Sequence, residues 1–273
     1  MSLVDTVRAA LLPAGLNLIA ALPPERYDRE VPESFHLSKR HPDGKSLVVI
    51  GNGGRAFWDG FRAYCENHQD FARRETHPLD AYTTMVIESA LPPLLRSVGV
   101  AGHVLYPFDF EREPVSFVHL GAVAGLAARS LLGVLVHPEF GPWIALRAAL
   151  LLNVEIEPTP VVPFDPCGGC AGKPCITACP AGAVSERGWD VPGCTAYRVG
   201  DGLRVRGESD EPPAGRPHPN PLPGGEGIGS GDCMARCEAR WHCVYGREHR
   251  YPADALAYHQ RRALETMRAR YAA

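Results

Sequence analysis

The sequence has no surplus of basic residues, because 28 Lys and Arg face 31 Asp and Glu, for a net charge of −3. A nucleic-acid-binding surface usually needs such a surplus, so we expect no nucleic-acid partner. The sequence also lacks an apolar run of 18 residues, which argues against a membrane span. Its first residues lack the basic and then apolar pattern of a secretory signal. We therefore expect a cytoplasmic protein with reduced cysteines.

Cysteine, in contrast, is abundant and grouped. Of nine cysteines, Cys65 stands alone and eight lie between positions 167 and 243. Four of them form a C-x2-C-x4-C-x3-C-P run, at Cys167, Cys170, Cys175 and Cys179. This run closely resembles the bacterial ferredoxin run C-x2-C-x2-C-x3-C-P, with two residues added in the middle gap. Cys65, on the apolar face of an expected helix, is predicted to be a buried structural thiol.

Disulfides and zinc are the alternatives for these cysteines. Disulfides need an oxidising compartment, for which the sequence shows no signal. Zinc sites use C-x2-C pairs, but they seldom include C-x3-C-P, and four zinc ligands would leave four cysteines idle. We therefore favour iron–sulfur clusters.

The second group of cysteines predicts a second cluster. It consists of Cys194, Cys233, Cys237 and Cys243, and four plus four is the count for two 4Fe–4S clusters. In two-cluster ferredoxins the last cysteine of each run ligates the other cluster. By this analogy we expect one cluster on Cys167, Cys170, Cys175 and Cys243, and another on Cys194, Cys233, Cys237 and Cys179. The second group departs from the pattern at Val244, where ferredoxins have proline.

The length and the 45% hydrophobic content suit a medium domain followed by a small one. We predict an α+β domain over residues 1–160, a cysteine-rich domain over 161–248, and a C-terminal helix over 249–273. A Pro- and Gly-rich stretch without apolar periodicity, residues 199–232, is predicted to be a disordered insertion.

Apolar periodicity predicts the elements of the first domain. Expected strands cover 16–20, 46–50, 103–108, 134–136 and 143–152. Expected helices cover 55–71, 116–132, and a stretch from Pro78 that ends before Pro92. Gly51-x-Gly53-x-x-Ala56 fits a degenerate dinucleotide fingerprint, but no second parallel strand follows, so a tight turn is favoured. Gly121 and Gly125 would share one face of helix 116–132.

Two families resemble this sequence. The block from Ser116 to Val184 resembles epoxyqueuosine reductase through Ala124-Gly125-Leu126, Ser130-Leu131-Leu132, the stretch from His137 to Trp143, and Cys179-Pro180-Ala181-Gly182-Ala183. The N-terminal 150 residues resemble the CblC-type cobalamin-processing protein. The matching stretches are Leu12-Pro13-Ala14-Gly15-Leu16, Glu33-Ser34-Phe35-His36-Leu37, and His137 to Arg147.

The resemblance implies a nitroreductase-like α+β domain that binds cobalamin, followed by a ferredoxin-like domain that passes electrons to cobalt. The cofactor-binding residues it assigns are Gly125, His137, Phe140, Gly141, Trp143 and Arg147. Epoxyqueuosine reductases use an acidic residue upstream of the A-G-L motif as general acid, and the nearest candidates are Asp109 and Glu111. The chain departs from CblC-type proteins at Glu139 and Ala122, and it lacks the helical-repeat tail with which epoxyqueuosine reductases grip tRNA.

Three functions follow as hypotheses. The first is an iron–sulfur, cobalamin-dependent oxidoreductase for reductive removal of cobalamin's upper ligand, or for epoxyqueuosine-type reduction of another substrate. The second is a ferredoxin-type electron-transfer module, and the third is a cobalamin-trafficking protein without turnover. The expected partners are a corrinoid or small-molecule substrate and an electron donor such as ferredoxin or flavodoxin.

Overall fold

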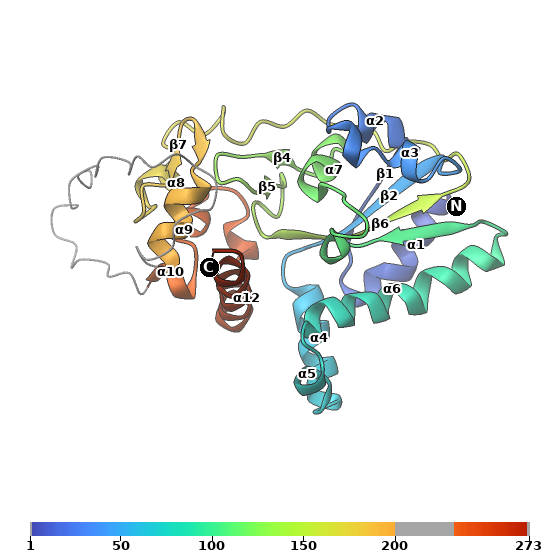
Figure 1. The fold of residues 1–273 in the computed structure, drawn as a ribbon, viewed down its shortest axis with the longest axis horizontal. Coiled ribbons are helices and arrows are strands. Elements are labelled where there is room, and N and C mark those ends of the chain that lie inside the picture. Colours follow the sequence, from blue (N-terminus) through green and yellow to red (C-terminus); the bar gives the residue numbers. More distant parts are fainter. Residues whose placement is uncertain (1, 200–231, 272–273) are drawn as a thin grey trace.

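A four-stranded antiparallel sheet organises the N-terminal region (Figure 1). The computed structural model describes residues 2–199 and 232–271. The strand order is β1 (Leu18–Leu22), β2 (Ser46–Gly53), β6 (Ile144–Leu152) and β3 (Gly102–Leu105). Mixed helices and antiparallel strands confirm the predicted α+β class. Of the predicted insertion, residues 200–231 lie outside the described residues.

Apolar side chains bury both faces of this sheet. Successive side chains of a strand point to opposite faces, so Val48 and Ile50 enter one core and Leu47 and Val49 the other. The first core is covered by α1 (Leu3–Leu11), α4 (Ala56–Asn67), α6 (Pro78–Ser97) and α12 (Ala253–Tyr271). The second core is covered by α2 (Pro24–Asp28), α3 (Leu37–Arg40) and α7 (Phe117–Val123). Burial on both faces explains why β2 is apolar at consecutive positions.

The cysteine region is built from short elements. They are α8 (Pro174–Thr177), β7 (Val184–Ser185), β8 (Gly188–Trp189), α9 (Val191–Val199), α10 (Asp232–Ala235) and α11 (Glu238–Trp241). Its small core contains Leu132, Cys175, Val184 and Ala239. The hairpin of β4 (Ala128–Arg129) and β5 (Leu135–Val136) leads from α7 towards it. Short connecting elements are η1 (Leu12–Ala14), η2 (Glu33–Phe35), α5 (Phe71–Arg74), η3 (Pro107–Asp109) and η4 (Arg247–His249).

The helix predicted over 116–132 is wrong in its second half. α7 ends at Val123, because Gly125 adopts the left-handed conformation (φ +73°) that ends helices. Gly121 and Gly125 therefore do not share a helix face. Gly121 packs against Leu135 and Leu146, whereas Gly125 packs against Val161.

Other boundaries also differ from the prediction. α6 continues through Pro92 and Pro93 to Ser97, because burial of Leu91 and Leu95 in the first core outweighs the backbone hydrogen bonds that proline cannot donate. The strand predicted over 103–108 ends at Leu105, and Pro107 opens η3. β2 extends through Gly51 and Gly53, and the positive φ falls on Gly54 (+70°).

Across residues 2–199 and 232–271, every helix is too short or too polar to cross a membrane.

Candidate functional site

Four cysteines line one small pocket in the cysteine region. They are Cys167, Cys170, Cys175 and Cys243, here called the first cysteine set. Burial, and then the negative charges of Cys243, Cys167 and Cys170, raise the pKa of the Cys175 thiol. Cys243 thus joins three cysteines of the ferredoxin-like run from almost 70 positions away in the sequence.

The other four cysteines form the second cysteine set: Cys179, Cys194, Cys233 and Cys237. Burial raises the pKa of Cys233 to about 11, and the charges of Cys237, Cys179 and Cys194 add to this effect. Cys179 therefore belongs spatially to the second set, although it ends the first run. The structure groups the cysteines as the ferredoxin crossing pattern would, and their ligation of clusters stays a prediction.

The loop that carries the first set is shaped by Asp165 and Lys173. The Asp165 carboxylate accepts hydrogen bonds from the backbone N–H groups of Cys167 (3.1 Å) and Gly168 (2.9 Å). Lys173, in the lengthened gap before α8, has φ +33° and is the one described residue other than glycine with a positive φ. Its ammonium pairs with Glu186 at 2.9 Å. Such strained backbone persists where surrounding contacts enforce it, and here it bends the chain around the pocket.

The donor groups fit metal–thiolate chemistry. All nine cysteines are free thiols, and burial raises the pKa of those at positions 175, 194, 233, 237 and 243. Buried thiols stay protonated unless a metal centre stabilises the thiolate, so loading these sets would release protons. The backbone N–H of Leu131 also points to Cys167 Sγ at 3.4 Å. Donors of this kind tune the potential of iron–sulfur clusters.

The turn from His137 to Trp143 lies directly against the cysteine region. Two backbone hydrogen bonds between His137 and Gly141, of 2.8 and 2.9 Å, close it. A Cβ on Gly141 would lie 2.1 Å from the carbonyl oxygen of Tyr245, and a Cβ on Gly246 would lie 2.2 Å from the carbonyl carbon of Phe140. The two glycines therefore let the turn touch the backbone that follows Cys243.

Side chains strengthen this junction. His137 Nδ1 accepts from the backbone N–H groups of Glu139 (3.0 Å) and Phe140 (3.2 Å), and burial lowers the His137 pKa. The Phe140 ring lies 4.6 Å from the His249 ring, measured between centroids. Arg240 donates from Nε to the Pro142 carbonyl (3.1 Å), with its guanidinium 4.7 Å from the Trp143 ring centre.

A β-bulge directs Arg147 into the first core. β2 pairs Ile50 with Ala148 and Gly51 with Leu146, which leaves Arg147 as the extra residue. Its Nε donates to Asn52 Oδ1 at 2.8 Å, its guanidinium lies 4.9 Å from the Phe57 ring centre, and burial lowers its pKa. Bulges often re-aim a side chain in this way.

The six residues assigned to cofactor binding therefore do not all lie in one place. His137, Phe140 and Gly141 are in the turn, and Arg147 is at the first face of the sheet. Trp143 is 1% exposed in the first core, and Gly125 is an exposed glycine beside Val161. Arg240 and Gly246 were not predicted from the sequence, because contacts between residues about a hundred positions apart leave no local signal.

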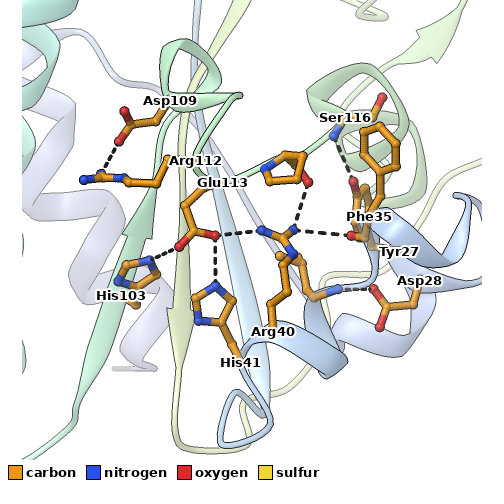
Figure 2. A network of polar contacts seen from close by, with 12 residues as sticks. Tyr27, Asp28, Phe35, Arg40, His41, His103, Asp109, Arg112, Glu113 and Ser116 are labelled. Carbon is orange, nitrogen blue, oxygen red and sulfur yellow. Dashed lines mark hydrogen bonds and ion pairs between the residues drawn. The ribbon is translucent and has the colours of Figure 1, made fainter.

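The two candidate acids lie apart from the cysteines. Asp109 in η3 is partly exposed and pairs with Arg112, and Glu111 is exposed. A nearby carboxylate, Glu113, is more enclosed, and it contacts Arg40, His41 and His103 (Figure 2).

No family model and no curated protein matches the chain. Among solved structures it is similar to the B12-trafficking protein CblC of C. elegans, a homologue of human MMACHC. The identity is 20% and the TM-score 0.46, over 59% of this chain and 74% of that one. It is also similar to an epoxyqueuosine reductase solved with a modified tRNA-Tyr stem loop, and to the Bacillus subtilis enzyme. Both are 16% identical, with TM-scores of 0.45 and 0.44, over 71% of this chain. The chain spans 56% of those two proteins. CblC and epoxyqueuosine reductase are the two families that the sequence motifs resemble.

Proposed function

We propose that this protein is an iron–sulfur oxidoreductase that passes electrons from two 4Fe–4S clusters to a bound corrinoid, for reductive removal of cobalamin's upper ligand. The observation that carries the proposal is the division of eight cysteines into two sets of four. Cys179, from the first sequence group, lies with the second set, and Cys243, from the second group, lies with the first set. This exchange is typical of two-cluster ferredoxins.

The junction between the regions supports an electron path towards the sheet domain. The backbone of Tyr245 and Gly246, just after Cys243, touches the turn at Phe140 and Gly141. A cofactor held at this turn would therefore lie beside the first cysteine set. The clusters would supply one-electron transfer, whereas the turn and Arg147 would position the acceptor.

Two of the six assigned residues have a different role in this proposal. Trp143 is buried in the first core and Gly141 is buried against the backbone of Tyr245 and Gly246, so they shape the domain and do not touch the cofactor. The contacts to a corrinoid fall to Gly125, His137, Phe140 and Arg147.

Reduction of an epoxyqueuosine-type substrate is the alternative enzymatic function. It would use Asp109 or Glu111 as general acid, and exposed Glu111 has the freer carboxylate because Asp109 pairs with Arg112. The net charge of −3 argues against a tRNA substrate, whereas the tRNA stem loop in one similar structure favours it. Electron transfer or cobalamin trafficking without turnover would use the same binding sites but leave the ligand intact.

The test is an anaerobic titration of the reconstituted protein with cob(II)alamin, with iron measured in the same sample. We expect about eight irons per chain, the content of two 4Fe–4S clusters. We also expect a base-off spectral shift that saturates near one equivalent of corrinoid. Reduction by ferredoxin or flavodoxin should then remove the upper ligand of an alkylated or cyanated cobalamin.

Any other outcome of this titration would favour a different function. Full iron content without a spectral shift would reject corrinoid binding and leave an electron-transfer module. A shift without ligand loss would indicate trafficking. An iron-free protein whose cysteines instead bind zinc through sulfur would reject the cluster assignment itself.

A further inference from the structure

Two histidines of the sheet region face the carboxylate of Glu113. His41 Nε2 lies 3.1 Å from Glu113 Oε2, and His103 Nε2 lies 3.4 Å from Glu113 Oε1. The two imidazole rings are 4.8 Å apart between centroids, with planes inclined by 31°. Figure 2 shows both rings directed at the same carboxylate. The potential ligand atoms of the three residues all lie within 4.8 Å of one another.

These separations match the spacing of metal ligands. Zinc bonds to imidazole nitrogen or carboxylate oxygen are about 2.0–2.1 Å long, so adjacent ligand atoms of a tetrahedral site lie about 3.3 Å apart. The two His–Glu distances already have this value within a few tenths of an ångström. Because these distances run to different oxygens of the carboxylate and the ligand atoms lie within 4.8 Å of one another, binding one ion requires the three groups to close by at most about 1.5 Å. His103 is exposed on edge strand β3, so its side chain is free to make that adjustment.

The surroundings prepare Glu113 to act as a ligand. Burial acts to raise the Glu113 pKa, but His41, Arg40 and His103 together outweigh it and lower the pKa, so the group is a carboxylate at neutral pH. Arg40 Nη1 contacts only Oε2, at 2.7 Å, and Nη2 donates to the Pro114 carbonyl at 2.8 Å. A carboxylate has about four acceptor positions, which leaves Oε1 available to a metal. Partners like Arg40 commonly orient metal-binding carboxylates.

Because Arg40 already pairs with Glu113, a bound cation would share the charge of this carboxylate with Arg40. The positive charge of Arg112, the residue before Glu113, is paired with the Asp109 carboxylate (Figure 2). His103 and Arg112 line a cavity of about 520 Å³ between β3 and α6. A metal bound by three protein groups would have its fourth position free for water or a small ligand.

We propose that His41, His103 and Glu113 form a binding site for a divalent transition-metal ion of the zinc type. The site joins the segment after α3, the edge strand β3 and the segment before α7. Two nitrogens and one carboxylate oxygen are the donor set of zinc sites that keep an open position. The site is independent of the cysteine sets, which would bind iron and sulfide.

The experiment uses cluster-loaded protein, so that the cysteines are occupied. Zinc is added in increments, and the bound zinc per chain is measured after desalting. X-ray absorption spectroscopy then gives the type and distance of the atoms that coordinate the zinc. We expect one tightly bound zinc with only nitrogen and oxygen ligands at about 2.0–2.1 Å, and no sulfur at about 2.3 Å. His103→Ala removes an exposed ligand without disturbing a core, and it should weaken zinc binding at least about tenfold.

His68→Ala is the matched control, because His68 is an exposed histidine on the surface of the same domain. Its zinc affinity should equal that of the unmodified protein. Unchanged zinc affinity in His103→Ala, or a zinc shell that contains sulfur in the cluster-loaded protein, would overturn the proposal. A shift of the thermal midpoint by zinc in the unmodified protein, absent in His103→Ala, gives a second readout, since a ligand that binds only the folded state stabilises it.

Discussion

The sheet region and the cysteine region are held together by different forces. Two apolar cores cover both faces of the sheet, and they include large buried side chains such as Trp143, Phe57 and Tyr27. The core of the cysteine region, within the described residues, contains only Leu132, Cys175, Val184 and Ala239. So small a core cannot offset the entropy of ordering the chain, and such regions usually depend on a bound metal centre. Hydrophobic burial therefore stabilises one region, and we expect cofactor binding to stabilise the other.

The cysteine region is nevertheless attached to the sheet at both of its ends. The chain enters it from β6 and leaves it through α12, which packs on α4 of the sheet region. The rings of Trp58 and Tyr258 lie 5.3 Å apart, and Asp254 accepts a hydrogen bond from Trp58 Nε1 at 3.2 Å. Loss of the clusters should thus lower the stability of the cysteine region, while the two anchors keep its fold in place and the Cys233 thiol buried.

The largest expected effect comes from removing one cysteine set. Replacing both Cys170 and Cys243 by alanine takes two ligands from the first set and none from the second. We expect the loss of about four of eight irons, with one cluster signal left in electron paramagnetic resonance. The sheet region should keep its thermal transition. Cys65→Ser, outside both sets, should keep all of the iron.

The same double variant tests the exchange between the groups. If clusters formed within each sequence group, Cys170 and Cys243 would belong to different clusters. Both clusters would then be damaged, and nearly all of the iron would be lost.

The second largest effect is a loss of stability at the junction between the His137–Trp143 turn and the cysteine region. Gly246→Ala adds a Cβ 2.2 Å from the Phe140 backbone at a residue with φ +62°, so it combines strain with a clash. We expect a loss of about 3 kcal/mol in the free energy of unfolding. Gly182→Ala has a similar φ of +60° but no atom within 4 Å of its Cβ, so it should cost only about 1 kcal/mol. Anaerobic urea unfolding measures both, and equal losses would show that the junction is not tightly packed.

The third effect is a pH dependence of the free energy of unfolding, which only the cluster-free protein should show. Burial raises the pKa of the Cys233 thiol from 9.0 to about 11. Above pH 9 the unfolded chain loses this proton while the folded protein keeps it, so stability falls as pH rises. We expect a loss of up to about 2 kcal/mol between pH 9 and 11. Urea midpoints across this range measure it, and a flat profile in the cluster-free protein would contradict the buried thiol.

The smallest effect lies in the sheet region. Ser2 caps α1, since its Oγ accepts the Asp5 backbone N–H at 3.1 Å. Ser2→Ala should lower the stability of the sheet region by about 1 kcal/mol and leave the iron content unchanged. Ser89→Ala, on the exposed side of α6, is the control and should cost nothing. An effect of Ser2→Ala on the clusters would show that the two regions are not independent.

Local patterns in the sequence were enough to place most elements of the sheet region. The apolar stretch 143–152 corresponds to β6, and 46–50 begins β2. They failed where a distant contact overrides local preference, as at Pro92 and Pro93 inside α6. They also failed at Gly125, whose left-handed conformation ends α7 without a break in apolar periodicity.

The spacing of the cysteines, by itself, determined the chemistry proposed for this protein, because thiolate ligands and their short gaps are local properties of the chain. The tertiary structure brings together the cysteine sets that the ferredoxin analogy had suggested. It also decided that Arg147 turns into the first core, that Trp143 is buried, and that His41, His103 and Glu113 share one site. Those contacts join residues far apart in sequence, and their geometry is set by sheet register, a β-bulge and core packing, which no short stretch of sequence encodes.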